Sequence, residues 1–442
     1  MYLQGWLFLN SMEILLHYVW KHKLFPLKQL HTTDGQELEV IDTGVHNTNS
    51  GPDFFNAKVK IGGTLWVGNV EIHQHAADWY AHRHHTDQAY GNVILHVAQV
   101  VDAEVLRPDG TSIPQLQLDI PDSVTNNYNE LLAADKYPPC HKLIASLSQL
   151  MIHSWLATLQ MERLEQKTCD INAIACRHQG DWEHAFFATM ARNYGFGING
   201  DAFAQWAESF PLSVAGKHRE NEFQIEALFM GQAGLLHEDA LPAAYRQKAL
   251  ADEYYQQLAA EYRFLQHKYQ LQPISHHLWR FLRLRPQNFP HIRIAQLVHL
   301  YCSNGINLSR LVECKSIDEI NECMHTRVTN YWTTHYAFGH TSAKSDKHLS
   351  PASLRLLVIN TAIPMLFAYG RHLTNENLCE RAVDMQEQLK AEDNHIVRMW
   401  KECGLHVENA AQSQALIQLK RRYCERKDCL RCRIGYEYLR KN

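Results

Sequence analysis

The chain has 442 residues, of which 45% are apolar and 20% are charged, proportions typical of a soluble globular protein with a hydrophobic core. This length suits two or three domains of about 150 residues each. The formal net charge of −4 excludes a general electrostatic attraction to nucleic acid, so any basic surface for such a partner must be local.

The cysteines and the N-terminal segment indicate the compartment. The 11 cysteines do not predict the disulfide framework of a small secreted protein, because their number is odd and the chain is long. The apolar N-terminal segment has no basic leader region and no small-residue cleavage site, and Glu13 interrupts it. No run of about 18 uncharged apolar residues is present, so we expect no membrane span. The expected location is the cytoplasm.

The first third of the chain is predicted to be α/β. A helix is expected over residues 13–22, where apolar side chains recur at helical spacing. From there to Leu118, short apolar runs alternate with turn residues, which predicts strands. The expected strands are Leu38–Thr43, Asn56–Ile61, Thr64–His73, Asn92–Val101, Ala103–Arg107 and Ile113–Asp119. Gly62-Gly63 predicts a hairpin between the second and third strands, and the polar segment Asp78–Tyr90 predicts a short helix.

From about Pro138 the spacing of apolar residues is helical nearly to the end of the chain. The expected helices are Ser148–Lys167, Asp181–Asn193, Glu222–Met230, Ala244–Tyr269, Ile292–Tyr301, Ser353–Tyr369 and Glu376–Leu389. Their apolar stripes predict helices packed on one another, and residues 335–348 are expected to form a mobile loop. We therefore predict the α+β class, with an α/β domain over residues 12–137 and a large all-α domain over residues 138–442.

Two acids and a histidine are predicted to come together on neighbouring strands. Asp53 follows a Gly-Pro turn, and Glu71 and His73 lie two residues apart near the end of the third strand. Alternate residues of a strand share a face, so the Cα atoms of Glu71 and His73 are about 7 Å apart on one side. Two carboxylates and a backbone carbonyl suit a hard cation such as Mg²⁺. Such an ion acidifies a water and stabilises charge on phosphate oxygens.

This arrangement, Pro52-Asp53 followed by Glu71-Ile72-His73 on the next strand, resembles the motif of the PD-(D/E)XK nuclease superfamily. The predicted helix and strands over residues 13–105 are similar to its α-β-β-β-α-β core. The resemblance implies a restriction-endonuclease-like mixed sheet with flanking helices. Over most of its length the chain also resembles an uncharacterised bacterial family, through the stretches GPDF, NVEIH, DW and VILHV. That second resemblance implies no activity.

The nuclease resemblance implies roles for individual residues. Asp53 and Glu71 would bind Mg²⁺ or Mn²⁺ with help from the Ile72 carbonyl, and Glu13 would match an extra acid that some members carry. The implied activity is hydrolysis of nucleic acid, DNA rather than RNA. The superfamily usually has Lys where this chain has His73, whose neutral imidazole could act as a base, orient water or join the metal shell. A catalytically inactive nucleic-acid-binding or scaffold protein of the same fold is therefore one alternative.

The histidine-rich segment after the third strand offers a second alternative. A helix there would place Asp78, His82 and His85 on one side, where imidazole and carboxylate groups could bind Zn²⁺. A zinc-dependent hydrolase using the residues from His73 to His85 is thus a rival interpretation, although the chain has no HExxH motif. In the nuclease interpretation His82 or His85 contacts substrate phosphate, and the segment also fits a solvated polar helix. His96, within an apolar strand, is expected to be a hydrogen-bonded core histidine.

Three cysteines near the C-terminus, Cys424, Cys429 and Cys432, have the spacing C-x₄-C-x₂-C. This spacing matches three ligands of a plant-type iron–sulfur site, and a tetrahedral Zn²⁺ site is the other option. Either site needs a fourth ligand, for which Cys403 is the nearest candidate. The alternative is a cluster of reduced cysteines that stabilises the chain terminus.

Basic residues are concentrated in two places. Lys and Arg residues flank the C-terminal cysteines and would form a local patch for a phosphate backbone. A second group around Pro286 and Pro290 includes Arg280, Arg283 and Arg293. We expect Arg280 and Arg283 to contact nucleic acid, and the alternative is that these arginines are helix-surface or buried ion-pair residues.

Overall fold

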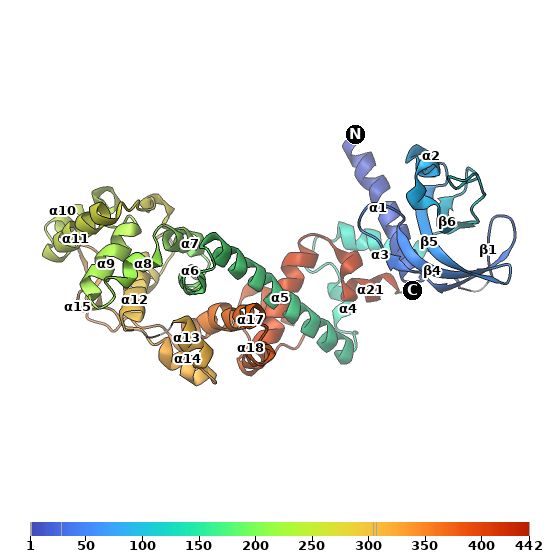
Figure 1. Ribbon diagram of the computed structural model, residues 1–442. Helices are drawn as coiled ribbons and strands as arrows, with labels where there is room; N and C mark the ends of the chain where they lie inside the picture. Colours follow the sequence, from blue (N-terminus) through green and yellow to red (C-terminus); the bar gives the residue numbers. More distant parts are fainter. Residues whose placement is uncertain (1, 28, 304, 306, 442) are drawn as a thin grey trace. The chain divides into compact units, whose positions relative to one another are not determined.

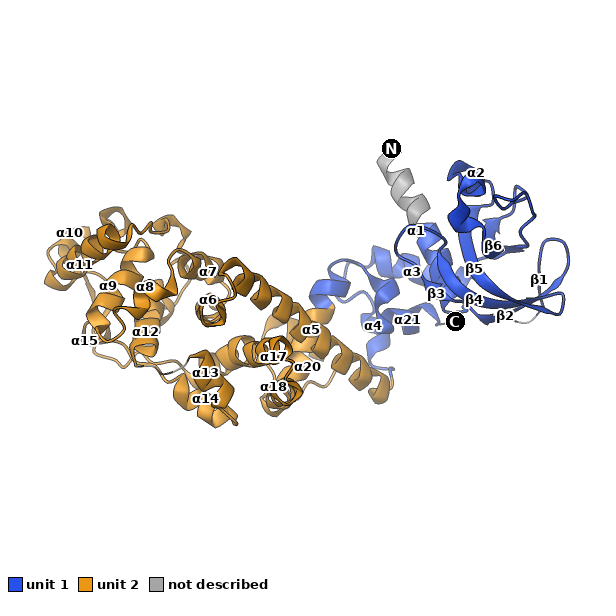
Figure 2. Cartoon of the chain, viewed as in Figure 1, with its two compact units in different colours: residues 1–147, 420–442 blue, residues 148–419 orange. Residues whose placement is uncertain are grey.

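The computed structural model describes residues 2–27, 29–303, 305 and 307–441, with side chains from Met12 onward. The chain forms two compact units, which Figure 2 shows in different colours. Unit 1 contains residues 1–147 and 420–442, and unit 2 contains residues 148–419. This division differs from the predicted one, because the C-terminal segment returns to the unit that contains the sheet.

Unit 1 is built on a seven-stranded mixed sheet with the order β1-β2-β4-β5-β6-β7, and β3 pairs with β4. The strands are β1 (Leu30–His31), β2 (Glu37–Asp42), β3 (Val45–His46), β4 (Phe54–Ile61), β5 (Thr64–His75), β6 (Val93–Val100) and β7 (Gln115–Gln117). β2, β4 and β5 are antiparallel neighbours, whereas β6 runs parallel to β5 and β7 runs parallel to β6. Figure 1 shows β4, β5 and β6 side by side.

Five of the six predicted strands are confirmed, and the strand predicted over Ala103–Arg107 is wrong. Its only ladder contact is an isolated bridge between Leu106 and Ser112. The Arg107 N–H donates to the carbonyl of Thr111 at 2.8 Å. The end of this segment therefore closes the turn around Pro108–Gly110, and it does not pair with a neighbouring strand over a longer stretch.

The second half of β5 is covered on both faces. Leu65, Trp66 and Val67 are exposed, whereas every residue from Val70 to His73 is buried. Consecutive residues of a strand point to opposite faces, so burial of this run requires packing on both sides. The helices α1 (Tyr2–Lys21) and α2 (Asp78–Ala81) both contact β5.

An irregularity at the start of β4 determines the position of Asp53. The pairing of β4 with β5 shifts between Phe54 and Ala57, and Asn56 has φ of +55°, which is uncommon for a residue other than glycine. Such a bulge bends the strand and changes the direction of nearby residues. β4 begins at Phe54 rather than at the predicted Asn56, so Asp53 lies directly before the first paired residue.

The remaining α-helices of unit 1 are α3 (Asp122–Ala133), α4 (His141–Ile144) and α21 (Arg433–Leu439). α21 contacts α3, as Figure 1 also shows. The hydroxyl of Tyr438 donates to Glu130 Oε2 at 2.8 Å, and the Asn127 amide donates to the Lys441 carbonyl at 2.7 Å. These bonds hold the C-terminal segment on α3.

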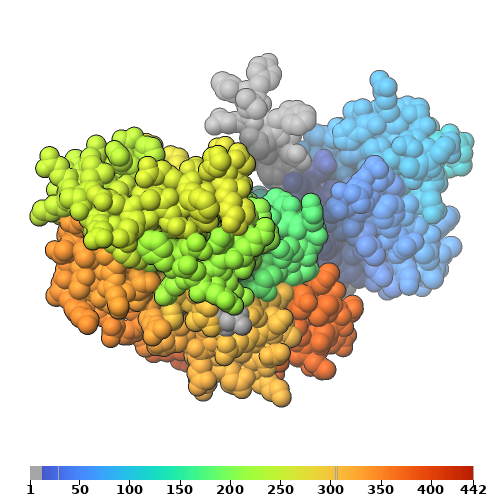
Figure 3. Space-filling model, turned by 60° about the vertical axis from the view of Figure 1, so that its left-hand side comes forward, coloured from blue at the N-terminus to red at the C-terminus, as the bar shows by residue number. Residues whose placement is uncertain are grey.

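Unit 2 is almost entirely helical. Its helices are α5 (Gln149–Arg177), α6 (Trp182–Tyr194), α7 (Gly200–Glu208), α8 (Leu212–Gly216), α9 (Glu222–Gln232), α10 (Arg246–Leu250), α11 (Glu253–Tyr269), α12 (Pro290–Cys302), α13 (Leu308–Glu313), α14 (Ile317–Cys323), α15 (Asn330–Thr333), α16 (Pro351–Leu357), α17 (Ile363–His372), α18 (Glu376–Gln388), α19 (His395–Glu402) and α20 (Ala410–Gln418). They enclose one large apolar core. Figure 3 shows its yellow-green segments resting on the orange segments from about residue 300 onward.

Two predictions for unit 2 need correction. The helix predicted over Ala244–Tyr269 is divided into α10 and α11, because the Asp252 side chain accepts the N–H groups of Tyr254 and Tyr255 and starts a new helix. The segment predicted as a mobile loop instead contains the hairpin of β8 (His335–Ala337) and β9 (His340–Thr341). Lys347 follows it in a buried position, where its ammonium donates to the carbonyls of Trp332 and Thr333.

One helical stretch among the described residues, Pro351–His372, is long and apolar enough to cross a membrane by length and composition alone. It consists of α16, a π-helical turn over Val358–Ala362 and α17. Of the apolar window in this stretch, 61% is buried inside the protein, as is ordinary for a core helix.

Gly231 allows α9 and α11 to approach closely. A Cβ atom at this position would lie 2.0 Å from the ring of Tyr262, which is buried and donates its hydroxyl proton to Gln232 at 2.8 Å. We expect Gly231→Ala to lower the free energy of unfolding by about 2 kcal/mol, because the gain in helix propensity, about 1 kcal/mol, does not offset the clash. Urea unfolding measures the effect. Gly216→Ala is the control, since its Cβ would meet its nearest atom at 3.8 Å, and equal losses in both variants would contradict the packing explanation.

Candidate functional site

The carboxyl groups of Asp53 and Glu71 are each bonded to the backbone of the other's segment. The Asp53 N–H donates to Glu71 Oε2 at 3.0 Å, and the Ile72 N–H donates to Asp53 Oδ2 at 2.9 Å. These reciprocal hydrogen bonds join the turn before β4 to the buried half of β5. The predicted proximity of the two acids is therefore confirmed.

The helix α1 contributes two further side chains. Nε2 of His17 lies 3.4 Å from Oδ2 of Asp53, and this buried nitrogen has no hydrogen-bond partner among the described residues. Glu13 is one turn earlier, and its carboxyl interacts electrostatically with His17, Asp53 and His82. The structure thus brings Glu13 to the predicted site. His17 was missed, although its i,i+4 spacing from Glu13 could have indicated it.

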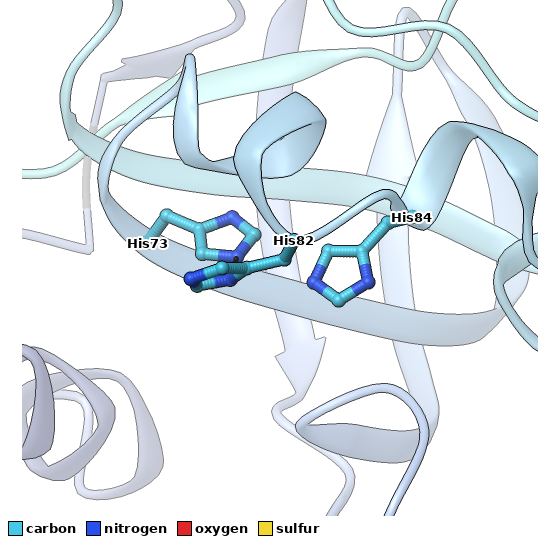
Figure 4. Close-up of side chains that lie close together, drawn as sticks. All are labelled: His73, His82 and His84. Atoms are coloured by element: carbon cyan, nitrogen blue, oxygen red, sulfur yellow. Dashed lines mark hydrogen bonds between the residues drawn. The ribbon is translucent and has the colours of Figure 1, made fainter.

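Three histidines form the other side of the site. Ligand nitrogens of His73, His82 and His84 all lie within 4.8 Å of one another. Figure 4 shows their rings close together, with His73 from β5, His82 from the end of α2 and His84 from the following turn. Nε2 of His84 is 3.3 Å from Oε1 of Glu71, so this histidine cluster is continuous with the carboxylates.

The predicted grouping of Asp78, His82 and His85 is wrong. α2 ends at Ala81, and Arg83 adopts a left-handed conformation with φ of +64°, so helical spacing does not continue. His84 joins His82 in place of His85. Asp78 instead accepts the N–H of His75 at 3.2 Å, and the ring of His85 packs on Tyr80 with ring centroids 5.1 Å apart.

A chain of buried hydrogen bonds determines the orientation of His73. Its Nδ1 is 2.9 Å from Nε2 of His96, and Nδ1 of His96 is 3.5 Å from the Gln115 amide nitrogen. The prediction that His96 is a hydrogen-bonded core histidine is confirmed. With the Gln115 amide as donor, Nε2 of His96 carries its proton and donates to His73. His73 then carries its own proton on Nε2, which lies 3.6 Å from Oε1 of Glu71 and 3.3 Å from Nδ1 of His82.

Burial favours the neutral forms of the two acids and of His73, His84 and His96. It raises the pKa of Glu71 above its ordinary value, with a further increase from the charge of Asp53. It also raises the pKa of Asp53, against the effect of the Ile72 hydrogen bond. Burial lowers the pKa of His84 to about 4 and that of His96 to about 3, and it lowers the pKa of His73 still further. In the metal-free protein, the contacts between Glu71 and its histidine neighbours are therefore contacts between neutral groups and not ion pairs.

These shifts predict how the stability of the metal-free protein depends on pH. The lowered pKa values of His84 and His96 lie below their ordinary value of about 6.5. At pH values between the lowered and the ordinary value, the unfolded state binds more protons than the folded state, so stability increases with pH. Above the ordinary pKa of Glu71, the folded state binds the extra proton, so stability decreases with pH. Below about pH 6.5 the three histidines, His73, His84 and His96, outweigh the two acids, Asp53 and Glu71, and above about pH 6.5 Glu71 dominates. We expect maximum stability near pH 6.5, measured by urea unfolding in EDTA. A continuous rise from pH 6.5 to pH 8 would contradict this assignment.

The residues present fit a divalent cation. Asp53 and Glu71 offer carboxylate oxygens, and Ile72, which follows Glu71 in the chain, offers its backbone carbonyl. Nε2 of His17, a buried nitrogen without a hydrogen-bond partner among the described residues, lies beside Asp53. A cation would favour ionisation of both carboxyl groups and so would offset the cost of burying them. Oxygen donors suit Mg²⁺ and Mn²⁺, and the adjacent imidazoles extend the choice toward Zn²⁺.

Other predicted site residues belong to unit 2. Arg280 and Arg283 are exposed there, and the Asn199 side chain fixes the backbone N–H and carbonyl of Arg280. Arg293 is buried and donates to Asn288 and Gln296, so it does not line a surface groove. Cys403 is also in unit 2, whereas the other three predicted cysteine ligands are in unit 1.

The fold and the site define a two-unit protein whose mixed-sheet unit contains a buried carboxylate–histidine centre. The chain belongs to the family described as "Protein of unknown function (DUF2851)", whose model matches residues 13–395. This confirms the predicted likeness to an uncharacterised family. The matched range includes every residue of the site and ends before Cys424. No curated protein and no solved structure matches the chain.

Proposed function

We propose that the protein is a metal-dependent phosphodiesterase that acts on nucleic acid, with Asp53, Glu71 and the Ile72 carbonyl as metal ligands. The observation that carries this proposal is the reciprocal bonding of Asp53 and Glu71, which holds a partly buried and a buried carboxyl group together. Among the described residues, the basic groups that contact them are histidines that burial keeps neutral. A divalent cation is the partner that would complete the charge balance.

The order of elements in unit 1 supports a restriction-endonuclease-like fold. α1 is followed by three antiparallel neighbours, β2, β4 and β5, and then by α2 and the parallel strand β6. The PD-(D/E)XK resemblance implies the same order of helix, three strands, helix and strand. Asp53 directly precedes the second of these three strands and Glu71 lies in the second half of the third, which agrees with the order of the two acids that the resemblance implies.

The proposed chemistry assigns a role to each group. A bound divalent cation supplies an acidified water and a Lewis acid for the phosphate oxygens. Asp53 and Glu71 bind and orient it through their ionised carboxylates. His73 stands where the superfamily usually has a positive Lys. Its Nε2–H is a neutral donor to Nδ1 of His82 at 3.3 Å, and it lies 3.6 Å from Oε1 of Glu71. His82 is exposed beside this pair and would meet substrate phosphate.

The proposal is tested by titrating Mg²⁺ and Mn²⁺ into the full chain with generic DNA and RNA. Asp53→Ala and Glu71→Ala are both expected to lose cleavage. Glu39→Ala, which changes an exposed acid on β2, is the control and is expected to retain it. Unchanged cleavage in both site variants would overturn the proposal. Salt-sensitive binding without turnover in the wild type would support the inactive nucleic-acid-binding alternative.

A second candidate, a zinc-dependent hydrolase, is favoured by the close approach of His73, His82 and His84. Three imidazoles and a water form a known catalytic zinc shell. This candidate requires Nε2 of His73 to be unprotonated so that it can bind zinc. His73 would then carry its proton on Nδ1 and donate to His96, which reverses the direction of the hydrogen bonds along the chain from Gln115 through His96 to His73. The carboxylate site needs no such reversal, so we rank it first.

The two candidates predict different behaviour for His82→Ala and His84→Ala. If the carboxylates bind the catalytic metal, both variants keep Mg²⁺-supported cleavage within about tenfold, because the histidines act as neighbours of the ligands. If the histidines bind zinc, each variant loses stoichiometric zinc and activity together. Metal analysis of the purified variants and cleavage assays with Mg²⁺ alone distinguish these outcomes. We expect the first outcome.

A further inference from the structure

Four cysteines from distant parts of the sequence gather in unit 1. Cys424, Cys429 and Cys432 come from the C-terminal segment, and Cys140 precedes α4. Cys140, Cys424 and Cys432 are buried, and Cys429 is partly buried. The Cys424 thiol interacts electrostatically with each of the other three. None of the 11 cysteines of the chain forms a disulfide.

The C-terminal segment has a defined local structure that holds three of these thiols. Lys427 has φ of +54°, and its N–H donates to the carbonyl of Cys424 at 3.1 Å. The N–H of Cys432 then donates to the carbonyl of Cys429 at 3.2 Å. Gly435 permits this turn to pack on α21, because a Cβ atom there would lie 2.0 Å from the Cys429 carbonyl oxygen. The segment is therefore a turn defined by hydrogen bonds and packing, and not a frayed terminus.

Contacts with residues 127–137 bring this turn to Cys140. The Lys427 ammonium donates to the carbonyl of Leu132 at 2.5 Å, and Lys420 lies over the ring of Tyr137 at 5.8 Å from its centroid. Tyr438 and Asn127 add the bonds to α3 described above. These contacts fix the C-terminal cysteines beside the stretch of chain that leads into Cys140.

The spacing of the thiols favours a cluster of several metal ions over a single ion. Four sulfur atoms at 2.3 Å from one tetrahedral Zn²⁺ lie about 3.8 Å apart. Over the described parts of the chain, only the histidine cluster has three or more ligand atoms within 4.8 Å of one another, so no three of these thiols lie that close together. An iron–sulfur cluster holds its cysteines further apart, because iron and sulfide ions lie between them.

We propose that Cys140, Cys424, Cys429 and Cys432 bind an iron–sulfur cluster that fastens the C-terminal segment to unit 1. The C-x₄-C-x₂-C spacing supplies three ligands and the fold supplies the fourth. Cys140 therefore replaces Cys403, the fourth ligand expected from the sequence, which belongs to unit 2. This inference does not rest on the proposed function, since it uses none of the residues of the carboxylate–histidine site.

The experiment uses the full chain purified without oxygen. We expect iron, acid-labile sulfide and visible absorbance in the wild type, and loss of most of all three in Cys140→Ser and in Cys429→Ser. Cys403→Ser and Cys176→Ser are the controls and should keep the wild-type iron content. Full iron content in Cys140→Ser would overturn the proposal. Stoichiometric zinc without sulfide, or a wild type that binds no iron even after reconstitution with iron and sulfide, would also overturn it.

A second measurement needs no variant and therefore does not depend on how the variants fold. Thiol alkylation of the wild type is mapped by mass spectrometry before and after the iron is removed by oxidation and chelation. We expect Cys140, Cys424, Cys429 and Cys432 to become reactive together when iron is lost, and we expect proteolysis after residue 419 to increase. Iron loss with no change at these four positions would overturn the ligand assignment.

Discussion

Replacing Glu71 with glutamine is expected to reduce metal-dependent cleavage by about 10³-fold or more and to stabilise the metal-free protein. The activity is lost because a neutral amide cannot supply the charge that binds the cation. The bound cation stabilises the transition state by several kcal/mol, and each 1.4 kcal/mol or so corresponds to about a tenfold change in rate. The stability increases because a buried acid that resists ionisation is removed. Gln can still accept the Asp53 N–H, so the hydrogen bond that positions Asp53 is preserved.

Two measurements check this prediction. Single-turnover cleavage with Mn²⁺ gives the loss of activity, and urea unfolding in EDTA at pH 8 gives the gain in stability, expected to be about 2 kcal/mol. Glu39→Gln, on an exposed position of β2, should change neither quantity. A Glu71→Gln variant that cleaves normally contradicts the metal-ligand role. A variant that is less stable than the wild type at pH 8 contradicts the assignment of Glu71 as a costly buried acid.

Mn²⁺ is expected to raise the unfolding temperature of the wild type, and the increase should become larger between about pH 6 and about pH 8. The pKa values of Asp53 and Glu71 are both raised, so these carboxyl groups must release protons to bind the cation, and its affinity rises with pH. At a concentration 100 times its dissociation constant, a bound ligand adds about 2.7 kcal/mol to the free energy of unfolding. Calorimetry in buffers of different ionisation enthalpy counts the protons released.

The variants separate the carboxylates from the histidines in this metal-binding experiment. Glu71→Gln and Asp53→Asn should lose most of the shift in unfolding temperature, whereas His82→Ala should keep most of it. An Mn²⁺ shift of wild-type size in Glu71→Gln would assign the cation to the histidine cluster instead. It would then favour the zinc-dependent hydrolase over the phosphodiesterase.

Much of the sheet and the proximity of Asp53 to Glu71 could be predicted from local patterns. Alternating apolar residues and the Gly62-Gly63 turn define the hairpin of β4 and β5, because turn chemistry and strand period act over a few residues. Two details of the site could not be predicted. They are the bulge at Asn56 and the left-handed Arg83, where residues other than glycine take a positive φ.

The break at Arg83 has a tertiary cause that local spacing does not contain. Trp79 is fully buried, and its indole N–H donates to the carbonyl of Leu106 at 3.0 Å. The ring of His84 stacks on Tyr90 with centroids 3.9 Å apart. These contacts from distant residues favour ending the helix after Ala81, and so they select His84 over His85. The partnership of Cys140 with the C-terminal cysteines is likewise non-local, which is why sequence spacing led to Cys403.

The return of residues 420–442 to unit 1 has a consequence for the order of events during protein synthesis. The sheet and α3 leave the ribosome early, but the segment that packs on α3 emerges only after the whole of unit 2 has been made. At synthesis rates of about 5–20 residues per second, this interval is on the order of half a minute. Unit 1 must therefore persist through that time with the face of α3 uncovered, and unit 2 folds with its N-terminal end already anchored.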